Sequence, residues 1–303
     1  MFRKPPHFRH PAVRDLAWVI GSVPLLDNSA AKIRLNLLDE EWMSDRFTRH
    51  LDWLEQLDQE PQALHAFLNL QVSKLIGKRF ETLLQFWFEN SEWFELVKHN
   101  VQMHDGDQTV GEIDFIVYDK YSDELLHIEA ACKYYWSSAQ SSQWETWLGP
   151  NRQDRLSLKM DKLKMQSRIC DSKIGKAFLQ ENNIERPISV VYLKGYLFYP
   201  FNELGRSVLP ALGHRHHQAG WYIHQNTLDR FIDTPRQWVI LPRTHWISPY
   251  HSELNDLDIL TGAEMIARVR QHMNRTTKAM LIAQTIEEGN FHREVSRGLI
   301  LTD

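Results

Sequence analysis

The stretch GEIDFIVYDKYSDELLHIEAACKYYW, residues 111–136, decides the expected fold. It contains two runs rich in apolar, β-branched and aromatic residues, 110–118 and 124–135, which are separated by the polar segment 119–123. Runs of this length bounded by turn residues are typical of β-strands. The stretch therefore predicts two neighbouring strands joined by a short turn.

Charged residues interrupt both predicted strands. Side chains on a strand alternate between its two faces, so Asp114 points away from the apolar side of the first strand. On the second strand, Glu129 and Lys133 share one face. Burying such charges costs several kcal/mol unless they pair or bind a cation. Carboxylate oxygens suit Mg²⁺ or Mn²⁺, and a nearby lysine can orient an attacking water, so this pattern indicates phosphodiester chemistry.

A fourth candidate, Glu81, lies in the segment 62–90, whose periodicity predicts an amphipathic helix or a pair of helices. Ile76, Phe80 and Trp87 follow its apolar face, and Glu81 borders that face. A carboxylate there is either a partner of the strand carboxylates or part of an ordinary salt bridge. Periodicity alone favours the salt bridge.

The remaining pattern alternates strands with helices. Further strands are expected at 96–103, which ends in the turn 105–107, and at 188–199 and 238–241; helices are expected within 30–60, at 154–169 and from Ala263 to about Glu288. This order predicts an α/β (α+β) fold in which a central mixed sheet is flanked by helices. We expect a single domain, with a core at about 62–200 and a C-terminal extension at about 201–303.

A basic segment follows the strand pair. Residues 151–176 contain eight basic and three acidic side chains. Four of the basic residues recur at three- and four-residue spacing beside the apolar row Leu156, Met160 and Leu163; they are Arg152, Arg155, Lys159 and Lys162. Such a stripe suits the phosphate backbone of a nucleic acid, and a merely solvated helix face is an equally good interpretation.

Two other features bear on function class. The only cysteines, Cys132 and Cys170, are too isolated to suggest a disulfide framework, which favours a reducing compartment such as the cytoplasm. The apolar stretch 16–26 is too short to cross a bilayer, so no membrane partner is expected.

A histidine-rich segment, GHRHHQAGWYIH, contains His214, His216, His217 and His224. A zinc site could be drawn from them, but neither a cysteine nor a carboxylate lies at ligand spacing along the sequence. We interpret the segment as a loop.

The order of a helix with an acid, a strand with Asp, a strand with Glu and Lys, and a second helix resembles the PD-(D/E)xK (restriction-endonuclease-like) nuclease superfamily over about 75–170. Nearly the whole chain resembles the bacterial domain-of-unknown-function family 1853. The stretches that carry this second resemblance are RDLAW (14–18), GEIDF (111–115), HIEAACKYY (127–135), LGPNRQDRLSLK (148–159), KGYLFYP (194–200) and Gly220-Trp221.

The superfamily resemblance implies that Asp114 and Glu129 bind Mg²⁺ or Mn²⁺ and that Lys133 is the catalytic lysine. It also implies that Glu81 is the helix acid, which acts through water or as a third metal ligand. One spacing departs from the superfamily, in which the second acid and the lysine are two residues apart. Here Glu129 and Lys133 are four apart, and Ala131 stands at the expected lysine position. A bulge in the strand or the flexible lysine stem could close the gap.

Three hypotheses follow. The first is a metal-dependent nuclease that hydrolyses phosphodiester bonds of DNA or RNA. The second is a catalytically inactive nuclease-fold module that binds nucleic acid or a protein partner. In the third, Asp114, Glu129 and Lys133 form only a buried ion-pair network and bind no metal.

Overall fold

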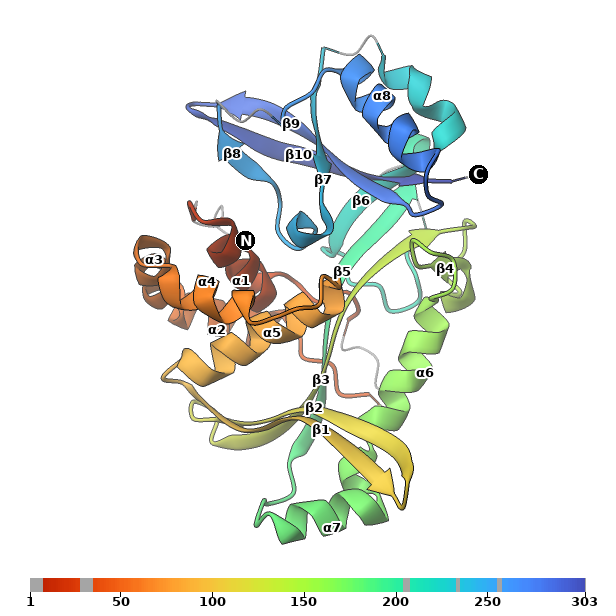
Figure 1. Ribbon diagram of the computed structural model, residues 1–303. Helices are drawn as coiled ribbons and strands as arrows, with labels where there is room; N and C mark the ends of the chain where they lie inside the picture. Colours follow the sequence, from red (N-terminus) through yellow and green to blue (C-terminus); the bar gives the residue numbers. More distant parts are fainter. Residues whose placement is uncertain (1–7, 28–34, 204–207, 233–234, 255–257, 303) are drawn as a thin grey trace. The chain divides into compact units, whose positions relative to one another are not determined.

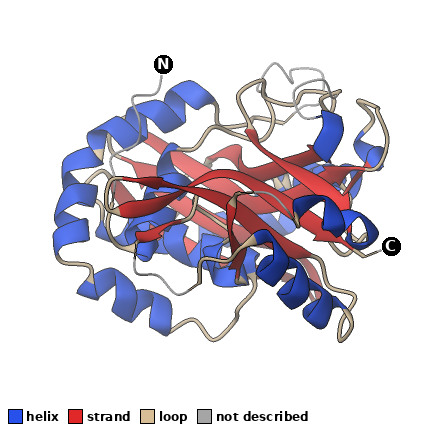
Figure 2. Ribbon diagram, turned by 90° about the horizontal axis from the view of Figure 1, so that it is seen from above, coloured by secondary structure: helices blue, strands red, loops and turns tan. Residues whose placement is uncertain are grey.

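A computed structural model describes residues 8–27, 35–203, 208–232, 235–254 and 258–302 (Figure 1). Its strands pair in one mixed sheet in the order β1-β2-β3-β5-β6-β10-β9-β7, with β4 beside β3 and β8 beside β10. Helices lie against the strands of this sheet (Figure 2). This is the α/β (α+β) architecture that the sequence predicts.

The chain divides into two compact units that interleave along the sequence. Unit 1 comprises 1–133, 157–194 and 212–216, and unit 2 comprises 134–156, 195–211 and 217–303. Strands β3 and β5 each contribute residues to both units. The expected single domain, with its core at 62–200, stays a prediction.

Unit 1 begins with a group of helices. These are α1 (Pro11–Gly21), α2 (Glu40–Arg49), α3 (Leu51–Gln59), α4 (Gln62–Asn69) and α5 (Ile76–Asn90). The pair α4 and α5 confirms the helical prediction for 62–90. Helices α2 and α3 confirm it for most of 30–60, of which residues 30–34 lie outside the described residues.

The strands of unit 1 follow these helices. They are β1 (Phe94–Asp105), β2 (Gln108–Asp119) and β3 (Glu124–Ser137), which pair antiparallel in sequence order, and the first part of β5 (Ile188–Pro200). The turn between β1 and β2 is made by Gly106, whose φ of 58° favours glycine. Helix α5 packs on the sheet through Phe88, whose ring lies 5.5 Å from that of Phe115 on β2.

Two further helices complete unit 1. They are α6 (Leu156–Gln166) and α7 (Lys173–Glu181), which connect β3 to β5. The apolar row Leu156, Met160 and Leu163 is fully buried, as its spacing predicts. Near α7, Cys170 and Leu179 pack against Ile113 and Ile116 of β2.

Unit 2 holds the C-terminal elements. They are β4 (Trp147–Leu148), the end of β5, β6 (Gln218–His224), β7 (Gln237–Leu241), β8 (His251–Glu253), α8 (Gly262–Met273), β9 (Met280–Glu288) and β10 (Phe291–Leu301). Helix α8 covers a core that contains Trp221, Phe231 and Trp238. The Trp221 ring lies over Gly298 of β10, and a Cβ at position 298 would come within 2.2 Å of that ring. Trp221 can therefore occupy this place only because residue 298 is glycine.

The expected helix from Ala263 to about Glu288 is wrong in its second half. Helix α8 ends at Met273, and residues from Met280 form β9. Leu281, Ile282 and Ala283 are fully buried, and β9 is an inner strand that pairs with β10 on one side and with β7 on the other. Continuous burial hides strand periodicity, which is why the segment resembles a helix in sequence.

Two other expectations need correction. The histidine-rich segment is not a loop throughout, because Gln218–His224 forms β6 between β5 and β10. The helix expected at 154–169 begins only at Leu156. In the described part of the chain, no helix is both long enough and apolar enough to span a membrane.

Candidate active site

The strand pair β2–β3 brings Asp114 and Glu129 together. Its backbone ladder runs from Asp119 opposite Glu124 to Phe115 opposite Ile128, so Asp114 and Glu129 are the next residues along the two strands. Beyond the ladder, the Asp114 side chain, and not a backbone carbonyl, accepts a hydrogen bond from the β3 backbone. Its Oδ2 accepts the N–H of Ala130 at 2.9 Å, which holds the carboxylate against β3.

A chain of hydrogen bonds holds Glu129 from the other side. Glu129 and His127 are both fully buried, and Nε2 of His127 lies 2.9 Å from Oε1 of Glu129. The other ring nitrogen, Nδ1, lies 3.0 Å from the hydroxyl of Ser189 on β5. A Ser189 hydroxyl that donates to Nδ1 leaves the imidazole proton on Nε2, where it is donated to Glu129. Sequence analysis missed Ser189 because it lies on a strand remote in sequence.

The second oxygen of Glu129 is the unusual atom of the site. Oε2 is buried and has no hydrogen-bond partner among the described residues. A buried carboxylate oxygen without a donor is costly, and native structures satisfy nearly all such groups by protein, water or an ion. Glu129 therefore has coordination capacity that the surrounding protein atoms leave unused.

The electrostatics of Asp114 point the same way. Burial, and then the negative charge of Glu129, raise the pKa of Asp114 to about 7. Glu81 contributes in the same direction, while the Ala130 N–H and Lys159 oppose the shift. Two carboxylates close enough to repel one another in a desolvated place are the arrangement that a divalent cation stabilises.

Glu81 lies on α5, close enough to raise the pKa of Asp114. It is also engaged in the salt bridge that periodicity alone favours, since Nζ of Lys78 lies 2.6 Å from Oε2 of Glu81. In the described part of the chain, Glu81 does not complete a compact three-ligand group with Asp114 and Glu129. Glu81 is thus placed to act on the site through water or by its charge.

One lysine approaches these acids, and a second lies beside that lysine. Lys133 lies on β3 and is half-buried, and Lys159 enters from α6. Burial, and then the positive charge of Lys133, lower the pKa of Lys159, whereas Asp114 and Glu129 raise it. Lys159 therefore lies close to Lys133 and to the two carboxylates. Because Asp114, Lys133 and Lys159 are all only partly buried, the cluster reaches solvent at these side chains.

Lys159 was expected on a phosphate-binding stripe rather than beside the acids. A sequence signal for its actual place exists: Lys159 lies three residues after Leu156 and four before Leu163, so it shares their buried helix face. Lys162 is exposed on the same helix.

The other two expected basic residues do not lie on the helix. Arg152 and Arg155 precede α6 and are exposed. The Arg152 guanidinium donates to the carbonyl of Thr302 at 2.8 Å within unit 2. The expected single helical stripe of four basic residues is therefore wrong, since only Lys159 and Lys162 belong to the helix.

The residues present fit a hard divalent cation. Asp114 and Glu129 offer oxygen ligands, one of which has no other partner, and Mg²⁺ usually takes one or two protein carboxylates while keeping several waters.

Comparison with known proteins identifies the family of this chain. Residues 14–301 match the family described as Domain of unknown function (DUF1853). The chain belongs to this family. No curated protein and no solved structure matches the chain significantly. The family description names no activity, so the function of this protein must be inferred from the geometry of the site.

Proposed function

We propose that this DUF1853 protein is a divalent-metal-dependent nuclease that hydrolyses phosphodiester bonds of DNA or RNA, on a core related to the PD-(D/E)xK superfamily. One observation carries the proposal: the buried Oε2 of Glu129 lacks a partner among the described residues, beside an Asp114 whose pKa burial and Glu129 raise to about 7. A bound Mg²⁺ or Mn²⁺ satisfies both features at once.

Asp114 and Glu129 would hold the ion, and His127 would orient Glu129 through the bond to Oε1. The metal would supply Lewis-acid activation of the phosphoryl group and of a water nucleophile. Lys159, with Lys133 beside it, would bring positive charge that balances the charge of a bound phosphodiester. Glu81, held by Lys78, would act through a water molecule.

The protonation of Asp114 sets the pH range of this chemistry. A carboxylate binds a metal ion only when it is ionised. Because the pKa of Asp114 is about 7, the fraction of protein ready to bind metal rises steeply between pH 6 and 8. We therefore expect cleavage at a fixed, subsaturating Mg²⁺ concentration to be slow at pH 6 and to approach its plateau above pH 8.

The direct test is a cleavage assay. Purified protein is incubated with plasmid DNA, single-stranded DNA and RNA in Mg²⁺, in Mn²⁺ and in a chelator. We expect metal-dependent cleavage of at least one substrate, and a loss of at least about 100-fold in Asp114→Asn. Asp161→Asn is the matched control, because Asp161 is 70% exposed and pairs only at the surface with Lys164. No metal-dependent cleavage, or full activity in Asp114→Asn, rejects the proposal.

The same assay distinguishes the two lysines. Lys133→Met and Lys159→Met each remove a charge while keeping an unbranched side chain of similar reach. We expect each variant to lose activity without losing metal binding, as measured by calorimetry. If both variants retain full activity, the proposed role of these ammonium groups is wrong.

The complete burial of Glu129 favours a second candidate function. An acid with no solvent-accessible surface suits a module that has kept the fold and binds nucleic acid or a protein partner without hydrolysing it. This alternative predicts salt-sensitive nucleic-acid binding, no cleavage in any metal, and equal binding by the wild type and Asp114→Asn.

A further inference from the structure

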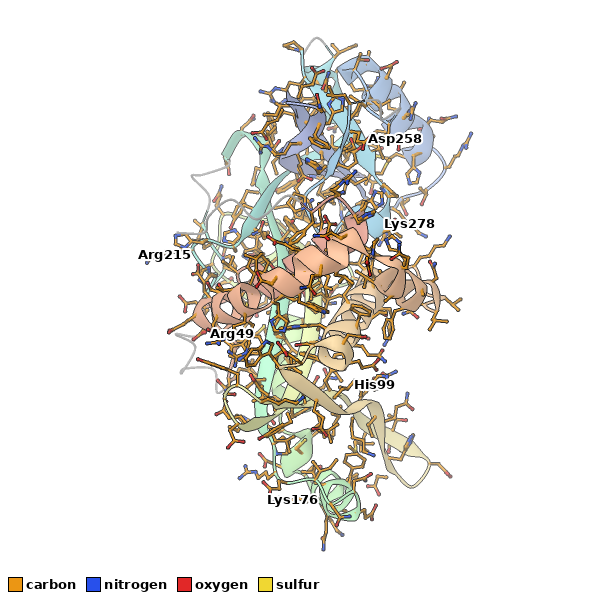
Figure 3. The ribbon with its side chains drawn as sticks, turned by 90° about the vertical axis from the view of Figure 1, so that its left-hand side faces the viewer. Arg49, His99, Lys176, Arg215, Asp258 and Lys278 are labelled. Atoms are coloured by element: carbon orange, nitrogen blue, oxygen red, sulfur yellow. The ribbon has the colours of Figure 1, made fainter. Side chains whose placement is uncertain are left out.

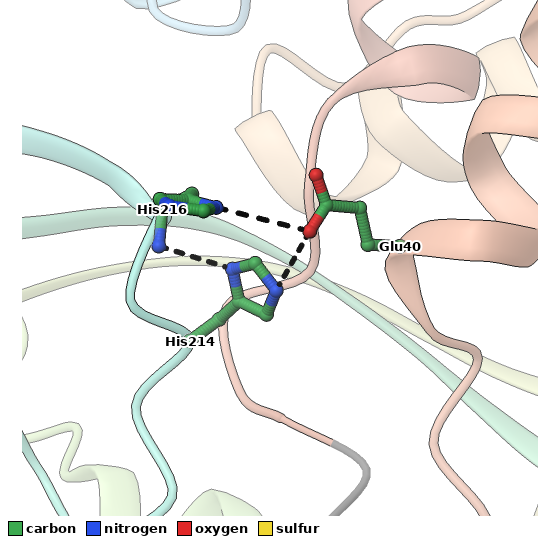
Figure 4. A group of neighbouring side chains, drawn as sticks. All are labelled: Glu40, His214 and His216. Atoms are coloured by element: carbon green, nitrogen blue, oxygen red, sulfur yellow. Dashed lines mark hydrogen bonds and ion pairs between the residues drawn. The ribbon is translucent and has the colours of Figure 1, made fainter. Parts of the chain in front are cut away.

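A second group of metal-ligating side chains in unit 1 is built from other elements. Glu40 is the first residue of α2, and His214 and His216 lie on the segment between β5 and β6 (Figure 4). One ligand atom from each of these residues lies within 4.8 Å of the others. The carboxylate that the histidine-rich segment lacks in sequence is thus supplied by a helix remote along the chain.

The fold positions both halves of this group. The N–H of His214 donates to the carbonyl of Leu25 at 3.1 Å, and the N–H of Asp27 donates to the carbonyl of Leu212 at 2.7 Å. These bonds hold the histidine segment in place. On the other side, Asp39 caps α2 by accepting the Trp42 N–H at 2.9 Å, which fixes the first turn that carries Glu40.

The distances suit a tetrahedral ion. Oε2 of Glu40 lies 3.2 Å from Nε2 of His214 and 3.9 Å from Nδ1 of His216. Ligands at about 2.0 to 2.2 Å from a tetrahedral Zn²⁺ lie roughly 3.4 Å apart. Small side-chain rotations therefore suffice to place all three ligand atoms on one ion.

Exposure also favours a metal over a simple buried hydrogen bond. The side chain of His216 is 67% exposed and that of Glu40 is 36% exposed, so an ion can reach the group from solvent. Arg215, between the two histidines, extends its side chain outward from the segment (Figure 3). Three protein ligands leave one tetrahedral position for water or for a ligand from another molecule.

The protonation state changes when an ion binds. Without an ion, Nδ1 of His214 accepts the backbone N–H of His216 at 3.2 Å. A neutral His214 ring therefore carries its proton on Nε2, which faces Glu40. A metal ion at Nε2 requires the proton to move to Nδ1. The backbone N–H of His216 then loses Nδ1 as its acceptor, a cost that coordination of the ion must outweigh.

We propose that Glu40, His214 and His216 form a site for a divalent transition-metal ion, with Zn²⁺ as the best-matched probe. Two imidazole nitrogens and one carboxylate form a donor set that Zn²⁺ prefers and that Mg²⁺ does not. The ion joins the start of α2 to the segment 212–216 and so stabilises unit 1. This site is independent of Asp114 and Glu129 and of the proposed nuclease activity.

Calorimetry on the chelator-treated full chain tests the proposal. We expect the wild type to bind Zn²⁺ at this site, and His216→Ala and Glu40→Gln to lose at least tenfold in affinity. His99→Ala is the matched control, since His99 is an exposed histidine on β1 (Figure 3). Asp114→Asn should retain this Zn²⁺ affinity, which separates the site from the proposed nuclease centre. Equal Zn²⁺ affinity in wild type and His216→Ala overturns the proposal.

A spectroscopic measurement covers the case in which a variant misfolds. With Cu²⁺ as the probe, we expect the paramagnetic resonance spectrum of the wild type to show hyperfine coupling to two imidazole nitrogens, and that of His216→Ala to one. His216 is exposed, so its replacement leaves the packing of unit 1 intact, and circular dichroism checks this. Coupling to fewer than two nitrogens in the wild type rejects the site.

Discussion

Two neighbouring carboxylates, Asp114 and Glu129, dominate the site at the scale of single residues. The pKa of Asp114 is raised to about 7 from an ordinary 3.8, first by burial and then by Glu129. The folded protein therefore holds the Asp114 proton more tightly than the unfolded chain does. As pH rises from about 4 to 7, Asp114 ionises in the unfolded chain but keeps its proton in the folded protein. The free energy of unfolding therefore falls over this range.

The destabilising effect of ionised Asp114 gives a prediction for the metal-free protein. Asp114→Asn should be more stable than the wild type at pH 8, by on the order of 2 kcal/mol, and no more stable near pH 4. The asparagine oxygen can still accept the Ala130 N–H, so the variant removes charge with little change in packing. Urea unfolding in a chelator at pH 4, 6 and 8 measures the difference.

Added Mg²⁺ provides the control at pH 8. It should raise the unfolding free energy of the wild type, because an ion that binds only the folded protein stabilises it, and it should leave Asp114→Asn nearly unchanged. If Asp114→Asn is less stable than the wild type at pH 8 in chelator, the Asp114 carboxylate does not destabilise the metal-free fold and this account is wrong.

At the scale of elements, local sequence signals mark helix ends well where a cap is present. Helix α8 begins with a capping box, in which Thr261 accepts the Glu264 N–H at 3.3 Å and the Glu264 carboxylate accepts the Thr261 N–H at 2.9 Å. The Thr261 N–H and the Thr261 hydroxyl both donate to the Glu264 carboxylate, and these bonds lower the pKa of Glu264. Helix α8 covers the aromatic core of unit 2, so its start matters for that core.

We expect Thr261→Ala to lower the free energy of unfolding by about 1 kcal/mol, because an N–H of the first turn loses its acceptor. Thr277→Ala is the control, since Thr277 is exposed and lies beyond the end of α8. Chemical denaturation followed by tryptophan fluorescence, which reports on Trp221 and Trp238, measures both variants. Equal destabilisation by the two substitutions contradicts the capping role.

At the scale of the whole molecule, charge is unevenly distributed. The formal net charge is −4, yet the segment 151–176 carries an excess of basic residues. A nucleic acid responds to local positive charge, since each neutralised phosphate releases counterions locally. Exposed Arg155 and Lys162 are therefore the candidates for contact with a phosphate backbone, whether or not the protein is a nuclease.

The corresponding prediction concerns salt dependence. In chelator, we expect nucleic-acid affinity to fall with salt concentration, and Arg155→Glu and Lys162→Glu each to weaken binding and to reduce the slope of log affinity against log salt by about 1. Lys176→Glu is the control, because Lys176 is exposed on α7, outside the proposed contact (Figure 3). Fluorescence anisotropy measures the three variants. Unchanged slopes for Arg155→Glu and Lys162→Glu reject these two residues as phosphate contacts.

The amino-acid sequence by itself determined the strand pair β2–β3, the helices α4 and α5, the buried row of α6 and the mixed sheet. These features depend on periodicity and on turn residues, which are local in sequence. It could not determine the end of α8 or the strand β9, because a strand whose two faces are both buried shows no alternation.

Only the tertiary structure decided which side chains meet. The placement of Lys159 beside Asp114, the bond from Ser189 through His127 to Glu129, and the meeting of Glu40 with His214 and His216 all join elements remote along the chain. Such encounters depend on how helices pack on a sheet and how segments cross between strands. Spacing within one segment carries no information about them, because the distance between side chains on different elements is set by packing.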